Sequence, residues 1–221
     1  SSVHSFTDPG MATNILIGFF VSLFSITPLV YFFIHSKKIP QEHKEERLDS
    51  REFWMFIGSL VFFLSAMFII AKTSIPVYNK IFGSHIAEPE DREFSYNKVM
   101  IMVAIIIGTL TAIAQYFKYK QTPSTYTIKK IALPTLTAAI ITALLAVFYP
   151  FTYTKQGIGF LAAIYVASFA SIYAVVANAN YIFVGLKGNI KSAGGSVAHI
   201  GFALMLLGML VSSSNKEIIS S

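Results

Sequence analysis

Six long apolar runs, with the charged residues between them or at their ends, constrain this 221-residue chain more than any other feature. The runs cover residues 12–34, 53–70, 97–117, 131–149, 158–184 and 195–212. Each is close to the roughly 20 residues that an α-helix needs to cross a bilayer. They are apolar on every face, whereas a membrane β-barrel shows segments of about ten residues with alternating polarity. The sequence therefore predicts an all-α, polytopic integral membrane helical bundle with about six transmembrane helices.

Composition agrees with that fold class and excludes several functions. Hydrophobic residues make up 54% of the chain and charged residues only 13%, which is too few charges for a water-soluble domain of this size. The net charge of +6 arises from residues in the connections, so we expect a multi-pass protein of the lipid bilayer and no binding of nucleic acid. Cysteine is absent, which excludes disulfides, thiolate-bound metals and covalent thioether attachment within this chain.

The distribution of basic residues predicts the orientation. One side of the membrane receives 11 of them, namely Lys37, Lys38, Lys44, Arg47, Arg51, Lys118, Lys120, Lys129, Lys130, Lys187 and Lys191. The other side receives 6, so the first side is expected to be cytoplasmic. Segments 1–11 and 214–221 would then be extracytoplasmic, on either side of a transmembrane domain at 12–213. We expect a short solvated helix at 36–52 and an acidic outer loop at 71–96.

Histidine is the most informative residue type, because only one of the five lies inside an apolar run. His35 and His43 belong to a basic connection and His85 to the acidic loop, so we expect these three to be solvated. His199 lies near the start of the last run. An ionisable group inside a bilayer is costly unless it is paired, so function is the default hypothesis for it. A proton relay, or a neutral imidazole that hydrogen-bonds a neighbouring helix, would use the same residue.

Small residues surround His199 on the predicted helix. Its own face carries Gly195 one turn before and Ala203 one turn after, which predicts two gaps that a flat ligand could fill. An adjacent stripe suits close helix packing and consists of Ala198, Gly201, Met205, Gly208 and Ser212. An axial histidine flanked by small residues suits a haem, whose macrocycle lies against the helix while the imidazole reaches the iron.

Two asparagines lie at the same expected depth as His199. Asn178 and Asn180 lie near the end of the fifth run, on the side where the sixth begins. One hypothesis is that an amide hydrogen-bonds a haem propionate or orients the imidazole, while Lys187 or Lys191 neutralises the propionate charge. Ordinary hydrogen bonding between helices is an equally good interpretation.

Segments near opposite ends of the chain resemble one family. Residues 2–6 (SVHSF) and 8–10 (DPG) are similar to the segment that follows the Trp-rich periplasmic domain in the CcmF family of cytochrome c maturation proteins, the haem lyase subunit. Residues 194–201 (GGSVAHIG) resemble that family's last haem-ligand helix. Residues 50–52 (SRE), ahead of the second run, also fit the family pattern.

The resemblance implies haem ligands, partners and a location. In that family one periplasmic histidine pair ligates haem delivered by a haem chaperone, and His4 matches its second member. A second pair inside the membrane ligates a permanent haem b, and His199 matches its second member. The b haem would reduce the transiently bound haem so that thioethers form on an apocytochrome c. Other maturation subunits would be partners in a bacterial-type inner membrane with both termini periplasmic, and no side chain here is assigned a catalytic role.

The chain also departs from that family. Its single tryptophan, Trp54, lies in an apolar run, so the Trp-rich motif and both partner histidines are missing. The chain therefore resembles a C-terminal portion of the family. We expect tight haem binding only when another chain, the missing N-terminal Trp-rich part, completes each site.

Two other functional classes remain open. A transporter or channel would use intramembrane Pro28, Pro134 and His199, although no half-to-half symmetry is evident. The two prolines are most simply packing residues, because membrane helices tolerate proline. A non-catalytic assembly subunit would pack against other membrane proteins through its small-residue faces.

Overall fold

The computed structural model describes residues 10–39, 47–151 and 156–214. These residues form helices and no strands, and six of the helices are long and apolar enough to cross a membrane. The prediction of an all-α polytopic bundle is confirmed, and the chain is a multi-pass membrane protein. Internal contacts divide it into two units, residues 1–45 and 46–221, and each unit is described by itself.

The first unit contains a single long helix. α1 (Gly10–His35) runs through Pro28 and ends in the 3-10 turn η1 (Ser36–Lys38). The helix is apolar along its candidate membrane span and long enough to cross a bilayer.

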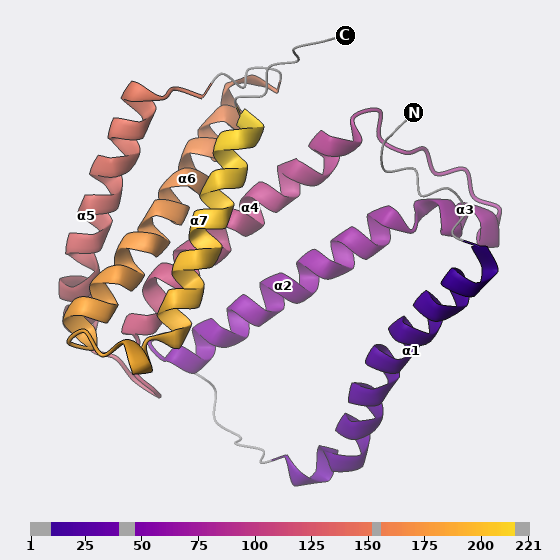
Figure 1. Ribbon diagram of the computed structural model, residues 1–221, viewed down its shortest axis with the longest axis horizontal. Coiled ribbons are helices and arrows are strands. Elements are labelled where there is room, and N and C mark those ends of the chain that lie inside the picture. Colours follow the sequence, from indigo (N-terminus) through magenta and orange to yellow (C-terminus); the bar gives the residue numbers. More distant parts are fainter. Residues whose placement is uncertain (1–9, 40–46, 152–155, 215–221) are drawn as a thin grey trace. The chain divides into compact units, whose positions relative to one another are not determined.

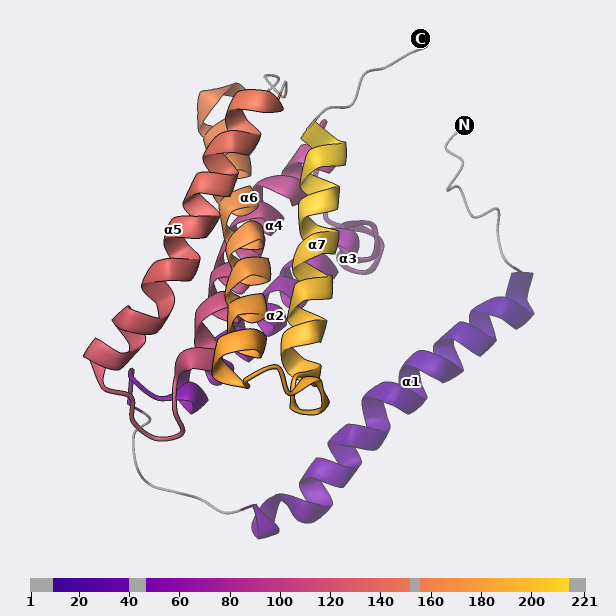
Figure 2. The same ribbon diagram turned by 60° about the vertical axis from the view of Figure 1, so that its left-hand side comes forward.

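The second unit is built around α6, as Figures 1 and 2 show. Its elements are α2 (Arg51–Thr73), α3 (Ile75–Phe82), α4 (Arg92–Ile113) with η2 (Ala114–Tyr116), α5 (Ser124–Phe148), α6 (Gly157–Asn180), the π-helical turn η3 (Tyr181–Gly185), η4 (Ile190–Ser192) and α7 (Gly194–Ser214). Helix α6 packs against α4, α5 and α7, and half of its membrane-spanning part is buried. Helix α2 packs on α4.

Small side chains explain why α6 occupies the centre. Ala167, Ala170, Ala174 and Ala177 are almost fully buried on it. At one crossing with α4, a Cβ atom placed on Gly108 would lie only 3.0 Å from the Cβ atom of Ala170. Small residues let helix backbones approach this closely, and close approach is the main source of packing energy in a lipid environment.

The connections contain more helix than the sequence indicates. The expected 71–96 loop holds α3 and the start of α4, where the Asp91 carboxylate caps the helix by accepting a 2.8 Å hydrogen bond from Phe94 N. Within the expected 36–52 helix, residues 40–46 lie outside the described residues. The described flanks are η1 and a turn at 47–50. Pro134 is fully buried within α5, which agrees with a packing role.

Candidate functional site

His199 lies on the face of α7 that is directed at the rest of the bundle. It follows the buried Ser196 by three residues and precedes the buried Ala203 by four, so all three share one helix face. The residue as a whole is partly buried. Its Nδ1 atom is fully enclosed and has no hydrogen-bond partner among the described residues.

An enclosed imidazole nitrogen requires an explanation. Nearly all buried polar atoms in native proteins have a partner, and leaving one without costs about 1–3 kcal/mol. A water molecule, a further chain or a bound ligand can supply that partner. The described residues contain no group of three or more His, Cys, Asp and Glu side chains that could hold a metal ion. A metal ion bound by His199 would therefore need most of its ligands from outside the described residues.

The small residues near His199 divide between a covered and an open flank. Ala203 is 1% exposed and belongs to a core cluster with Ala174 and Ala177 of α6, so the gap predicted beside it is filled and that prediction is wrong. Gly195 has no atom within 4 Å of a Cβ placed on it, so its flank is open. The small-residue stripe that includes Gly201 is exposed and is not packed against any described helix of this chain.

A polar cluster adjoins His199 where several helices end together. We call it the polar junction, and it consists of Arg51, Gln115, Tyr116, Asn178, Asn180 and Ser196. The Ser196 hydroxyl donates a 3.1 Å hydrogen bond to Gln115 Oε1, which fixes the first turn of α7 to the end of α4. Because Ser196 lies one turn from His199 on the same face, this bond also fixes the position of the imidazole along the helix.

Arg51 anchors α2 to the same place. Its guanidinium donates to two backbone carbonyls, at 2.9 Å to Phe117 O and at 3.0 Å to Gln115 O. Both carbonyls follow α4, where a helix leaves carbonyls without internal partners and carries partial negative charge. The Arg51 guanidinium therefore caps the end of α4. It also orders Gln115, whose side chain accepts the hydrogen bond from Ser196.

The two asparagines are used within the protein. Asn178 is fully buried, and its amide donates to Thr111 O at 2.9 Å and to Ala174 O at 2.8 Å. Its Oδ1 atom is also buried and has no described partner. The hypothesis that one of the two amides contacts a propionate or the imidazole stays a prediction. The Asn180 amide donates to the Tyr116 hydroxyl at 3.0 Å, and this hydroxyl in turn donates to the backbone carbonyl of α6 at residue 177. Hydrogen bonds within the protein therefore engage the amide nitrogens of both residues.

Sequence reasoning missed most of the polar junction. Gln115 and Tyr116 are uncharged residues near the end of an apolar run, where aromatic side chains commonly mark the membrane interface, so neither stood out in the sequence. Residues 50–52 (SRE) were the part of the sequence that pointed to this cluster, but they were interpreted only as part of a family resemblance. In the structure Ser50 caps α2 by accepting from Phe53 N at 3.2 Å, and Glu52 accepts from Lys120 N at 3.1 Å.

The remaining predicted positions are spread over the chain. His4 and His43 lie outside the described residues. His35 Nδ1 bonds to Tyr31 O at 3.0 Å within α1, and His85 is exposed. Lys187 and Lys191 are exposed in the connection between α6 and α7, and the structure shows no contact of either with His199.

The chain was compared with known protein families, proteins and solved structures. No family model, no curated protein and no solved structure matches the chain.

Proposed function

We propose that this protein is a haem-handling membrane subunit of a cytochrome c haem lyase and that His199 provides one axial ligand of a haem b. The observation that carries the proposal is the partly buried imidazole of His199, which lies in an apolar helix beside the open flank at Gly195 and has no described hydrogen-bond partner at Nδ1. Histidine is a common axial ligand of haem iron. The resemblance of residues 194–201 to a haem-ligand helix supports the same assignment.

The residues around His199 fit one half of a haem site. The imidazole supplies a donor, and the flank at Gly195 leaves space beside it. The flank at Ala203 is filled by α6, so a macrocycle has no room there. A second axial ligand would come from another chain. Bound haem would supply one-electron chemistry at its iron, while Ser196 and Gln115 hold the helix turn that carries the imidazole.

The resemblance extends the proposal beyond the described residues. His4 would ligate haem that is delivered by a haem chaperone and then attached to an apocytochrome c. The protein would act in a bacterial-type inner membrane with both termini periplasmic, together with other maturation subunits and a Trp-rich partner chain. The excess of basic residues on one side supports this orientation.

A visible spectrum of the purified native complex tests the role of His199. We expect a reduced b-type spectrum that is lost in His199→Ala and retained in His85→Ala, the matched change of an exposed histidine. A spectrum unchanged by His199→Ala would remove the central assignment. Substitution of His4 by Ala is expected to abolish cytochrome c maturation without removing the b-type spectrum, and unchanged maturation would refute its role.

A non-catalytic assembly subunit is the second candidate function. It is favoured by the exposed small-residue stripe of α7, where Gly201 and Gly208 have no atom within 4 Å of a placed Cβ. Glycine-rich faces of this kind allow close packing against a further membrane helix. A complex that contains no haem, and that falls apart when Gly201 is replaced by Leu, would favour this function.

A further inference from the structure

The short helix α3 presents an exposed apolar surface, which we call the α3 face. It consists of Val77, Tyr78, Ile81 and Phe82, and each of these residues is between 36% and 75% exposed. At 3.6 residues per turn the four positions lie on one side of the helix. A contiguous apolar surface of this kind commonly marks a place of contact with a protein or a membrane.

The other side of α3 is polar and is already in use. The Asn79 side chain accepts hydrogen bonds from Ser84 Oγ at 2.8 Å and from Ile86 N at 3.0 Å, and it donates one to Ile86 O at 2.9 Å. Gly83 makes this return of the chain possible, because its φ of 62° is in the left-handed region. The segment that follows α3 is thus held at the polar side, and the α3 face stays exposed.

The connection to α2 fixes the level of α3 in the membrane. Figure 1 shows α3 directly beyond the end of α2, and Ser74 is the only residue between them. Ser74 N donates to Ile70 O at 2.9 Å, and Ser74 O accepts from Tyr78 N at 2.9 Å, so hydrogen bonds hold both helices to this residue. Two residues span at most about 7 Å, so α3 starts close to the depth at which α2 ends.

Helix lengths place that depth at the edge of the hydrocarbon core. α2 has 23 residues, which at 1.5 Å per residue is about 34 Å, against roughly 30 Å for the core of a bilayer. α3 has 8 residues and measures about 12 Å, so it is too short to cross the core. A short helix at this level has lipid within reach of its apolar side.

The residue types in and beside α3 agree with a membrane surface. Lys72 lies in the last turn of α2 and Lys80 in the last turn of α3, while α3 itself contains no acidic residue. Lysine side chains can follow apolar surface while their ammonium groups reach the head groups. Tyr78 adds an aromatic ring with a polar hydroxyl, which is typical of the membrane interface. Apolar, aromatic and lysine side chains together characterise helices that lie in the plane of a bilayer surface.

We propose that α3 is an interfacial helix and that the α3 face is inserted among the lipids of the leaflet where α2 ends. The partner of this surface is the bilayer itself, which the end of α2 already brings to it. The inserted helix ties the start of the acidic connection ahead of α4 to the membrane surface. This role is independent of the function proposed for His199.

Spin labelling of the full chain in lipid bilayers tests the proposal. Because the chain has no cysteine, Ile81→Cys and Phe82→Cys each carry a single nitroxide at an exposed position. Oxygen concentrates in the hydrocarbon and a nickel chelate stays in water, so collisions with the two report lipid and water separately. We expect high oxygen access, low nickel access and a label depth of about 5–10 Å below the head-group boundary. His85→Cys, an exposed position beyond α3, is the matched control and should show high nickel access.

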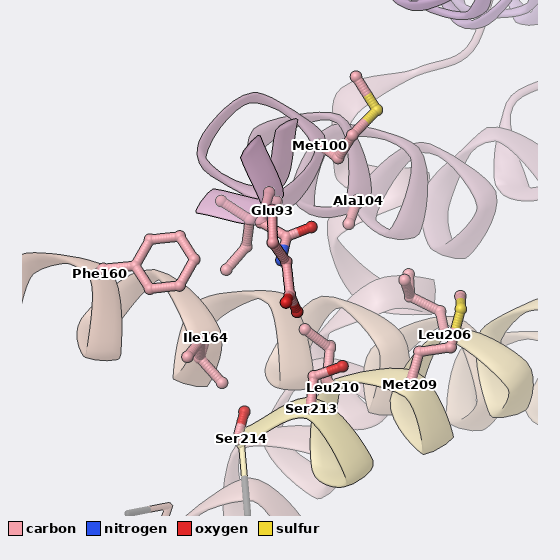
Figure 3. Close-up of a pocket in the computed structure, with 12 residues that line it drawn as sticks. Glu93, Met100, Ala104, Phe160, Ile164, Leu206, Met209, Leu210, Ser213 and Ser214 are labelled. Atoms are coloured by element: carbon pink, nitrogen blue, oxygen red, sulfur yellow. The ribbon is translucent and has the colours of Figure 1, made fainter. Parts of the chain in front are cut away.

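Two reference positions calibrate the measurement. Leu136 of α5 is 60% exposed on a membrane-spanning helix and gives the values for contact with lipid. Leu206 is 9% exposed and lines a crevice of about 240 Å³ between α4, α6 and α7, shown in Figure 3, so Leu206→Cys gives the values for a label enclosed by protein.

Three results at Ile81 and Phe82 are distinguishable. Values that approach those of Leu136→Cys would support insertion into lipid. Nickel access equal to that at His85 would overturn the proposal, because the α3 face would then lie in water. Low access to both reagents, as at Leu206, would also overturn it and would show that a protein covers this face.

Discussion

Two arginines only four residues apart differ in what they contact. Arg51 donates to two backbone carbonyls beyond α4 and is partly buried. Arg47 is exposed and donates to Asp49, and this hydrogen bond holds the pKa of the Asp49 carboxyl below its usual value. The contacts of Arg51 join two helices, while those of Arg47 remain within one turn.

Substitution of Arg51 should therefore weaken the fold. We expect Arg51→Ala to lower the free energy of unfolding by about 2 kcal/mol, because two charge-assisted hydrogen bonds are lost at a partly buried position. Arg51→Lys should recover only part of the loss, since an ammonium lacks the fixed fork of a guanidinium. Arg47→Ala is the matched control and should have little effect. Unfolding in mixed detergent micelles measures all three, and equal effects of Arg51→Ala and Arg47→Ala would contradict the role given to Arg51.

Two polar side chains near the ends of apolar runs differ in their contacts. The Asn178 amide nitrogen donates to two carbonyls inside the protein, whereas its Oδ1 atom and the enclosed Nδ1 of His199 have no described partner. Both residues lie near the end of an apolar run, so their sequence contexts do not separate them. Asn178 reaches from α6 to Thr111 of α4, while His199 lies on α7 one turn from the open flank at Gly195.

At the level of elements, helices α4 and α6 approach each other very closely at one crossing. Gly108 of α4 faces Ala170 of α6, where a placed Cβ would lie 3.0 Å from the Ala170 Cβ and 3.2 Å from its carbonyl atoms. Because backbone atoms are part of this contact, a larger residue cannot be accommodated by rotating one side chain. The whole crossing of α4 and α6 must move instead.

Two glycine substitutions test this contact. Gly108→Leu should lower the free energy of unfolding by about 1–3 kcal/mol through overpacking. Gly208→Ala on α7 is the control, because nothing lies within 4 Å of its placed Cβ. It should be neutral or stabilising by up to about 1 kcal/mol, as alanine is the better helix former. A fold that tolerates Gly108→Leu as well as Gly208→Ala would show that α4 and α6 do not pack as described.

The ends of the elements were less predictable than their presence. Helix α4 begins at Arg92, ahead of its apolar run at 97, because Asp91 caps it. Helix α5 begins at Ser124, also ahead of its run at 131. Apolarity marks where a helix meets lipid, whereas caps and polar first turns decide where it starts. Helix α3 was missed because it is short and lies beside the acidic residues of the connection.

At the level of the whole molecule, six helices are long and apolar enough to cross a bilayer, and six crossings would place successive connections on opposite faces of it. The connection before α4 is acidic, and the one between α6 and α7 is basic. Since basic connections remain on the cytoplasmic side, we expect the second of these to face the cytoplasm.

The absence of cysteine makes this orientation directly measurable. Glu90→Cys and Lys187→Cys each introduce one thiol at an exposed position. A membrane-impermeant thiol reagent added outside intact cells should label Glu90→Cys and should label Lys187→Cys only after the membrane is opened. Labelling of both from the same side would contradict six spans, and the reverse pattern would contradict the orientation.

The apolar runs were sufficient to predict a bundle of membrane-spanning helices, because in lipid a run of about 20 apolar residues must satisfy its backbone internally. They also made His199 stand out as a costly residue. Which helix faces are covered depends instead on how the helices pack. Ala203 and Gly201 look alike in the sequence, yet one is buried against α6 and the other is exposed. The partners of Arg51 and Ser196 lie more than 60 residues away, and packing of separate helices alone brings them together.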